Sequence, residues 1–261
     1  QVGRKFGIRK VGHVGTLDPL ATGLMLIAVN EATKTIPFME DSSKEYIATF
    51  KFGLLTTTLD LEGDVVEDKQ VDEFSQDSLT RVLNQFKGRI TQIPPLTSAI
   101  KVGGVPLYKY AHQNIKMDVP PRQVDIFELE LLDYQHPFFT IRSKVSSGTY
   151  IRTLGHDIAH HLGTVATTIK LRRTKVGNFT INMAKTIENI TEFDIMSIGD
   201  FLGHIPTMSV DEETAKRVKV GADISLKSSE IRVKIFFEGR LLAIYQKREE
   251  QTYHCLRGFN L

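Results

Sequence analysis

Residues 44–52 alternate between two sets of side chains. One face carries Tyr46, Ala48, Phe50 and Phe52, and the other carries Ile47, Thr49 and Lys51. This period of two predicts a β-strand that buries one face. Further strands are predicted at 122–132, 138–146 and 165–175, and the apolar run 24–29 is typical of a buried strand.

A spacing of three and four residues predicts helices elsewhere. Ile151, Leu154, Ile158 and Leu162 recur at this spacing, so residues 150–162 are expected to form a helix that ends at Gly163. Residues 75–86 show the same pattern, and 107–114 is expected to form a short helix. Residues 56–63 are polar and predict a loop, whereas 89–104 predict a long irregular loop with a short strand.

The order of these elements predicts the fold class. Strands joined by hairpins, with only occasional helices, favour an α+β fold: a mixed, mainly antiparallel central sheet with flanking helices. The pattern changes after Gly177, so we expect a first domain at 1–180, a bridging segment at 181–207 and a small β-rich domain at 208–261. A helix at 210–220 and strands at 231–237 and 241–245 are its predicted elements.

Composition narrows the function classes only a little. A chain of 261 residues with 41% hydrophobic and 25% charged residues is an ordinary globular protein. Its net charge of +2 does not by itself indicate a nucleic-acid binder, so a basic surface must come from local clustering. The single cysteine, Cys255, excludes an intramolecular disulfide framework and suits a reducing cytoplasm.

Membrane and metal functions find no support in the sequence. No apolar run approaches a membrane-spanning length, and no signal peptide opens the chain. His156 and His160 lie four apart on a predicted helix, but no third ligand is spaced to complete a zinc site. We therefore expect neither a metal nor an organic cofactor.

Asp18 is the carboxylate with the most informative surroundings. Pro19 follows it and biases Asp18 towards extended geometry, while Gly15 and Gly23 permit tight turns or the close approach of a ligand. A carboxylate next to a predicted buried strand is well placed for chemistry. An ordinary turn with a helix-capping Asp explains the same residues when they are taken alone.

Six short segments of the chain combine into a recognisable series: 13–23 (HVGTLDPLATG), 31–34 (EATK), 44–46 (KEY), 92–101 (QIPPLTSAIK), 148–154 (GTYIRTL) and 171–174 (LRRT). In this order they resemble the motifs of the tRNA pseudouridine synthase B family, and residues 13–23 resemble its signature. The resemblance implies the pseudouridine synthase fold. It also implies isomerisation of uridine to pseudouridine at position 55 in the T arm of tRNA, without a cofactor. In this family a compact RNA-binding module often stands where residues 208–261 lie.

The resemblance also implies roles for particular residues. Asp18 would be the nucleophile, because a carboxylate can hold one fragment covalently while the base is detached, by attack on C1′ or on the pyrimidine ring. Arg152 would hold and orient that carboxylate, and Tyr46 would stack on the uracil. Leu171 would pack against the target base, and His13 would contact the region of the extruded nucleotide. Each of these also has an ordinary structural explanation.

Basic residues are the candidates for RNA contact. Lys170, Arg172, Arg173 and Lys175 place four cations in six residues of a predicted strand. Strict alternation would put Lys170 and Arg172 on one face and Arg173 and Lys175 on the other, so that one pair could meet phosphate. Lys34 and Lys101 could reach phosphates or support the Asp18 loop, and either could equally be a solvated charge. The residues expected to bind RNA are Lys34, Lys101, Arg172, Arg173 and Lys175.

Three further expectations complete the interpretation. We expect a cytoplasmic monomer that acts on the T arm stem-loop of tRNA without an obligate protein partner or a membrane. The alternatives are a tRNA-binding or folding protein that uses the same cleft without catalysis, and the catalytic subunit of an RNA-guided complex, which the short tail disfavours. The chain lacks an initiator Met and the family's Lys-Pro-x-Gly segment, so we expect its native beginning to be missing.

Overall fold

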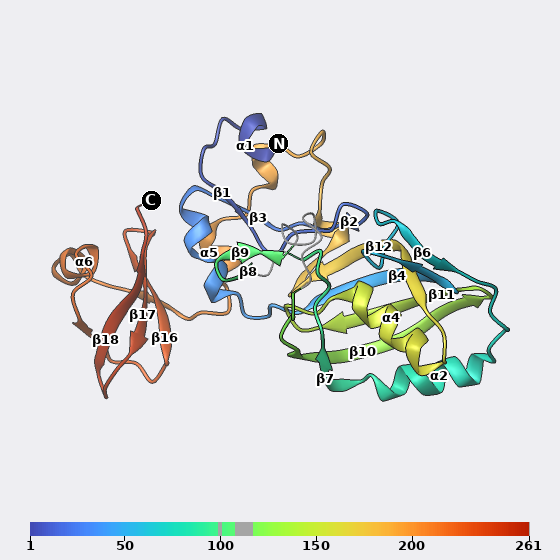
Figure 1. The fold of residues 1–261 in the computed structure, drawn as a ribbon. Helices are drawn as coiled ribbons and strands as arrows, with labels where there is room; N and C mark the ends of the chain where they lie inside the picture. Colours follow the sequence, from blue (N-terminus) through green and yellow to red (C-terminus); the bar gives the residue numbers. More distant parts are fainter. Residues whose placement is uncertain (99–100, 108–116, 261) are drawn as a thin grey trace. The chain divides into compact units, whose positions relative to one another are not determined.

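The computed structural model describes residues 1–98, 101–107 and 117–260 (Figure 1). Two compact units divide the chain: Gly15–Met25 and Asp41–Ala184 form one, and Gln1–Val14, Leu26–Glu40 and Lys185–Leu261 form the other. We call them the sheet unit and the terminal unit. This division differs from the expected first domain at 1–180, because two N-terminal segments group with the C-terminal part of the chain.

A mixed sheet of seven strands forms the sheet unit (Figure 1). Its order is β13 (Phe179–Thr180), β12 (Ala166–Val176), β4 (Lys44–Phe52), β11 (Phe138–Val145), β10 (Arg122–Gln135) and β7 (Gly88–Gln92). These neighbours are antiparallel, whereas β2 (Thr22–Gly23) pairs in parallel with β12. The predicted α+β class with a mainly antiparallel sheet is confirmed.

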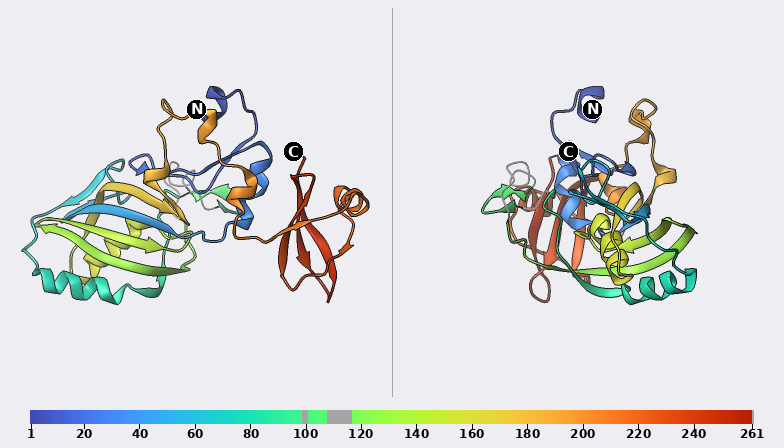
Figure 2. Two further views of the ribbon diagram at one scale, coloured as in Figure 1. Left: turned by 180° about the vertical axis from the view of Figure 1, so that it is seen from behind. Right: turned by 45° about the vertical axis from the view of Figure 1, so that its right-hand side comes forward.

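Helices α2 (Gln76–Gln85) and α4 (Ile151–His161) pack on one face of this sheet. Phe50 lies beneath α4, and a Cβ added to Gly155 would lie only 1.9 Å from the Phe50 ring, so glycine permits this close packing. The rear view in Figure 2 shows the opposite face of the sheet. Tyr46, Leu171 and Arg173, which are described below, lie on the helix-bearing face, which also buries Ala48 and Phe50.

Short elements complete the sheet unit. Strands β5 (Leu54–Thr56) and β6 (Val65–Asp68) form a hairpin around the predicted loop, and β8 (Lys101–Val102) pairs with β9 (Val105–Pro106). The 3-10 turn η3 (Ile181–Met183) follows β13. The helix expected at 107–114 lies, apart from Leu107, outside the described residues.

The prediction of one buried strand at 24–29 is wrong. Leu24 is buried but is not part of a strand, and its amide donates a hydrogen bond to the Arg173 carbonyl. Only β3 (Ile27–Val29) is a strand, and it pairs with β1 (Val11–His13) in a half-buried two-stranded sheet. A short apolar run does not distinguish these outcomes, because tertiary contacts decide where each part pairs.

The terminal unit contains a five-stranded sheet with α6 (Glu212–Lys219). Its order is β14 (Thr207–Ser209), β16 (Arg232–Phe237), β17 (Arg240–Lys247), β18 (Thr252–Gly258) and β15 (Ile224–Ser225). The sequence predicted α6, β16 and β17 but missed the other three strands. The remaining elements are α1 (Val2–Lys5), η1 (Asn30–Lys34), η2 (Ile36–Phe38), η4 (Glu192–Asp194) and α5 (Ile198–Phe201). None of the helices in the described ranges is long and apolar enough to cross a bilayer.

Gly23 holds the Asp18 loop against β12, and its replacement should destabilise the protein. Gly23 has a φ of +109°, and an added Cβ would lie 2.2 Å from the Arg173 carbonyl oxygen. Gly23→Ala should therefore lower the free energy of unfolding by about 3 kcal/mol in urea denaturation. Gly88→Ala is the control, since Gly88 also has a positive φ but nothing lies within 4 Å of its added Cβ. Equal losses for the two variants would contradict the argument.

Candidate active site

The Asp18 loop runs from Gly15 to β2 within the sheet unit. The Asp18 carbonyl accepts a hydrogen bond from the Ala21 amide at 2.9 Å, which closes a turn over Pro19. The Asp18 side chain is 36% exposed, so it can be reached by a ligand.

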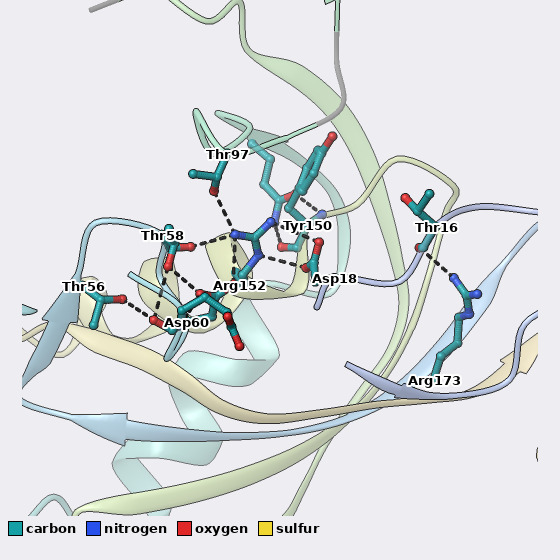
Figure 3. Close-up of polar contacts among 11 residues, drawn as sticks. Thr16, Asp18, Thr56, Thr58, Asp60, Thr97, Tyr150, Arg152 and Arg173 are labelled. Atoms are coloured by element: carbon teal, nitrogen blue, oxygen red, sulfur yellow. Dashed lines mark hydrogen bonds and ion pairs between the residues drawn. The ribbon is translucent and has the colours of Figure 1, made fainter. Parts of the chain in front are cut away.

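Arg173 on β12 fixes this loop from beneath. Its side chain is fully buried, and Nε donates to the Leu24 carbonyl at 2.7 Å. Its Nη1 donates to the Thr16 carbonyl at 3.2 Å (Figure 3). Its Nη2 donates to the Gly15 carbonyl, also at 3.2 Å. The expectation that Arg173 contacts RNA is therefore corrected, because its guanidinium is inside the protein and bound to the loop backbone.

Arg152, in the first turn of α4, holds the Asp18 carboxylate with two nitrogens. Its Nε lies 2.9 Å from Asp18 Oδ2, and its Nη2 donates to Oδ1 at 3.2 Å (Figure 3). The Arg152 side chain is 4% exposed. A planar guanidinium held in this way fixes the direction of a carboxylate as well as balancing its charge. The predicted pairing of Asp18 and Arg152 is present in the structure.

Asp60 is a second carboxylate on the same guanidinium, and the sequence analysis missed it. Arg152 Nη1 lies 3.2 Å from Asp60 Oδ2 and also donates to the Thr58 carbonyl at 2.8 Å and to Thr97 Oγ1 at 2.9 Å. Asp60 is 3% exposed, and its Oδ1 accepts from the Glu62 amide at 3.0 Å and from Thr58 Oγ1. Asp60 between threonines and a glycine resembles an ordinary turn, so only its burial reveals this role.

Tyr46 and Leu171 lie on the same sheet face as Arg173. In the register, Arg173 is opposite Tyr46 and Leu171 is opposite Ala48, and both predicted base-contacting side chains are buried. Burial raises the pKa of the Tyr46 phenol; the Arg173 guanidinium opposes this and the Asp18 charge adds to it. The phenol is therefore neutral at ordinary pH and stands within the electrostatic range of Asp18.

Arg172 and Lys175 face the other side of the sheet. Arg172 is exposed opposite Ile47, and Lys175 pairs with Glu45 at 3.1 Å. The expected alternation, with Arg173 and Lys175 on one face, is wrong because a β-bulge between them shifts the register. These two cations point away from the face that carries Tyr46, and their contact with RNA stays a prediction.

Two predicted residues belong to the terminal unit, and the side chain of a third is not among those that the structure describes. His13 is exposed in β1 of the terminal unit. Lys34, in the same unit, pairs with Glu31 at 2.6 Å and donates to the Gly258 carbonyl at 3.2 Å, so protein groups already hold its ammonium. Lys101 is in β8, and its side chain lies outside what the structure describes.

Replacement of Arg173 should lower the free energy of unfolding but should not remove an electrostatic contact with RNA. Arg173→Met removes three hydrogen bonds to backbone carbonyls, so we expect a loss of about 3 kcal/mol in the free energy of unfolding and a lower kcat. The slope of log Kd for RNA against log salt concentration should not change, since no phosphate contact is lost. A shallower slope without loss of stability would restore the RNA-contact interpretation.

A pocket of about 370 Å³ borders α4 and includes Thr153, His156 and Asp157 in its lining. Burial raises the pKa of the Asp157 carboxyl to about 6 from 3.8, against the opposing charges of His161 and His160. In the part of the chain that the structure describes, no three His, Cys, Asp or Glu side chains are grouped to hold a metal ion.

Asp157 should make stability depend on pH in the direction opposite to a salt-bridged carboxylate. Its folded pKa lies above its unfolded value, so ionisation destabilises the native state as pH rises through about 4 to 6. Asp157→Asn should therefore gain stability over the unsubstituted protein, and the gain should be about 1–2 kcal/mol larger at pH 7.5 than at pH 4.5. Urea denaturation at the two pH values measures this, and an equal effect at both would contradict it.

Comparison with solved structures gives the fold of this chain. Among solved structures, a Cbf5-Nop10-Gar1 complex matches 99% of this chain and 78% of that chain with a TM-score of 0.71 at 23% identity. An H/ACA RNP bound to a substrate RNA containing 2′-deoxyuridine matches 100% of this chain and 79% of that chain, with a TM-score of 0.68 at 20% identity. This chain therefore has the α+β fold of those structures.

Sequence comparisons give the family. The family model described as "TruB family pseudouridylate synthase (N terminal domain)" matches residues 3–151, and "tRNA pseudouridylate synthase B C-terminal domain" matches 152–197. A "tRNA pseudouridine synthase B" of Clostridium tetani is 35% identical over 93% of this chain and 88% of its own length. One of Oceanobacillus iheyensis is 40% identical over 93% and 85%. The chain belongs to the TruB family of pseudouridylate synthases and is an isomerase.

Proposed function

We propose that this enzyme isomerises uridine to pseudouridine in the T arm of tRNA, at position 55, with Asp18 as its nucleophile. The tRNA substrate is supported by the names of the relatives, each a tRNA pseudouridine synthase B. One observation carries the catalytic assignment: a partly exposed carboxylate held by two nitrogens of a buried guanidinium. A nucleophile needs both features, since it must be reachable and fixed in direction.

The contacts of Arg152 suit a carboxylate that forms a transient covalent bond. Arg152 orients Asp18, and Asp60 holds the other side of the same guanidinium. The guanidinium would therefore stay in place when Asp18 moves to bond with the substrate. Asp18 attacks either C1′ or the pyrimidine ring. The N1–C1′ bond breaks, the uracil turns, and the C5–C1′ bond forms. The bond between Asp18 and C1′ or the ring breaks, which regenerates the carboxylate, and the C5 proton leaves as N1 gains one.

The target base must leave the RNA stack before Asp18 can reach it. Flipping a nucleotide out costs a few kcal/mol, and contacts between the flipped base and the enzyme offset this cost. Tyr46 and Leu171 are the proposed contacts with the base, since both lie on the sheet face that carries the loop-binding Arg173. A neutral Tyr46 phenol can stack on uracil and can also exchange a proton late in the reaction.

The remaining roles follow from the resemblance to the family and from the positive charge of the side chains. His13 would contact the extruded region of the RNA, while Lys34, Lys101, Arg172 and Lys175 would contact its backbone. We propose that the enzyme acts in the cytoplasm as a monomer, with tRNA as its partner, and needs neither a metal nor an organic cofactor. The terminal unit from residue 208 onwards would supply an additional RNA-binding surface.

Release of tritium from a T-arm stem-loop labelled at uracil C5 tests this proposal. The C5 proton must leave when C5 bonds to C1′, so turnover should release tritium and leave pseudouridine in the RNA. A stem-loop whose only labelled uridines lie in the stem is the control for position. Tight binding without release would favour the alternative, a tRNA-binding or folding protein that uses the same cleft.

A further inference from the structure

Lys44 is a cation beside the Asp18 loop to which the resemblance assigned no role. It is the first residue of β4 and lies two positions before Tyr46, so both side chains belong to the same face of the sheet. A Cβ added to Gly15 would lie 3.0 Å from Lys44 Nζ and 3.3 Å from its Cε. The lysine side chain therefore extends across Gly15, and the absence of a side chain at Gly15 leaves room for it.

Two positive charges meet at this glycine. Arg173 Nη2 donates to the Gly15 carbonyl at 3.2 Å, and the Cβ position on Gly15 lies 3.6 Å from Arg173 Nη1. Burial, together with the positive charge of Arg173, lowers the pKa of the Lys44 ammonium. Arg173 donates to three backbone carbonyls and, being a cation itself, it repels the Lys44 ammonium rather than compensating its charge.

The Lys44 ammonium has spare capacity to donate hydrogen bonds. Within the described residues, its polar contact is a long hydrogen bond of 3.3 Å to Ser147 Oγ, and no carboxylate is paired with it. Ser147 and Gly148 are exposed, and nothing lies within 4 Å of a Cβ added to Gly148. Open space therefore lies beside Gly148, the residue after the serine that this half-buried ammonium contacts. An ammonium can donate three hydrogen bonds.

We propose that Lys44 binds a backbone phosphate of the RNA, at the target uridine or an immediate neighbour, and so positions the substrate over Asp18. This inference rests on the proposed function. Phosphate is the anion that an RNA substrate brings, and an uncompensated cation beside a second cation is stabilised by such a charge. Gly15 and Asp18 are three residues apart, at most about 10 Å along the chain. A phosphate held by Lys44 beside Gly15 would therefore lie on the same loop as the Asp18 carboxylate.

Lys44→Met is the test variant because methionine keeps an apolar stem over Gly15 and removes the charge. Lys51→Met is the matched control: Lys51 is on the same strand but the opposite face, and Asp68 already pairs with it at 3.0 Å. On an unmodified T-arm stem-loop, Lys44→Met should raise Kd about tenfold. It should also reduce the slope of log Kd against log salt by about one unit. Lys51→Met should leave both unchanged.

Stem-loops with an uncharged phosphate analogue at a single position can identify the phosphate that Lys44 contacts. A series of stem-loops, each with one uncharged methylphosphonate near the target uridine, is bound to the unsubstituted enzyme and to Lys44→Met. At one position the methylphosphonate should weaken RNA binding by the unsubstituted enzyme about tenfold, and it should not weaken RNA binding by Lys44→Met. The result with the unsubstituted enzyme stands even if Lys44→Met folds poorly.

Three results would overturn the proposal. In the first, the losses of binding affinity from Lys44→Met and from the methylphosphonate add at every position. In the second, no methylphosphonate weakens RNA binding by the unsubstituted enzyme. In the third, Lys51→Met raises Kd as much as Lys44→Met does. Tritium release by the unsubstituted enzyme is measured on the same unmodified RNA. Failure of turnover would therefore refute the proposed function, whereas turnover with additive losses would refute only the role of Lys44.

Discussion

Asp18→Asn should lower kcat for pseudouridine formation by at least about ten-thousand-fold, because the amide cannot act as the nucleophile. The amide is nearly isosteric with the carboxylate, and Arg152 retains Asp60 as its other partner, so the fold should persist. Binding of the stem-loop should change by less than about threefold, since backbone phosphates supply most of the affinity. Single-turnover tritium release and fluorescence anisotropy measure the two quantities.

The matched control for this variant is Asp68→Asn. Asp68 is a carboxylate in the same unit whose side chain is 55% exposed and paired with Lys51. It should keep full activity. If Asp18→Asn retains more than about a hundredth of the activity, another group is the nucleophile and the proposed mechanism is wrong.

Arg152→Met should reduce both stability and activity, since one guanidinium holds two carboxylates. The variant leaves Asp60 buried without its ionic partner, which typically destabilises a protein by about 3–5 kcal/mol. Asp18 would lose the contacts that orient it, and we expect kcat to fall by at least about a thousand-fold. Urea denaturation and tritium release on the folded variant measure the two losses.

Two further variants separate the structural part from the catalytic part. Arg152→Met with Asp60→Asn should recover most of the stability, because the unpaired buried charge is gone, but not the activity. Arg152→Lys keeps a charge but cannot span both carboxylates, so its activity should remain low. Recovery of activity in the double variant would show that Arg152 acts only on folding.

Local patterns predicted the regular elements well where one face of a strand or helix is buried. The alternation at 44–52 predicted β4, and the spacing of Ile151, Leu154 and Ile158 predicted α4. The resemblance of the segments around Asp18 and Arg152 to those of a known family predicted that these two side chains pair, and the structure shows the ion pair. These results depend on residues that are neighbours in the chain, or on a resemblance that spans whole motifs.

Other assignments could not be made from neighbouring residues. The bulge in β12 buries Arg173 and exposes Lys175, although the sequence presents both as cations in one strand. Asp60 belongs to the site only because the loop between β5 and β6 meets the first turn of α4. Only Ile27–Val29 of the strand predicted at 24–29 forms, because the Leu24 amide bonds to β12 whereas Ile27 pairs with β1.

The sequence by itself therefore determined the α+β class, the main strands and helices, and the family to which the chain is similar. Only the tertiary structure decided which cations are buried, which carboxylates share Arg152, and that the Lys44 side chain crosses Gly15. Periodicity reports the side of each element that is buried, a local property of the chain. The partners of a charged side chain lie on segments distant in sequence. The energy of each charge–charge interaction depends on the distance between the partners and on their burial, which only the tertiary structure sets.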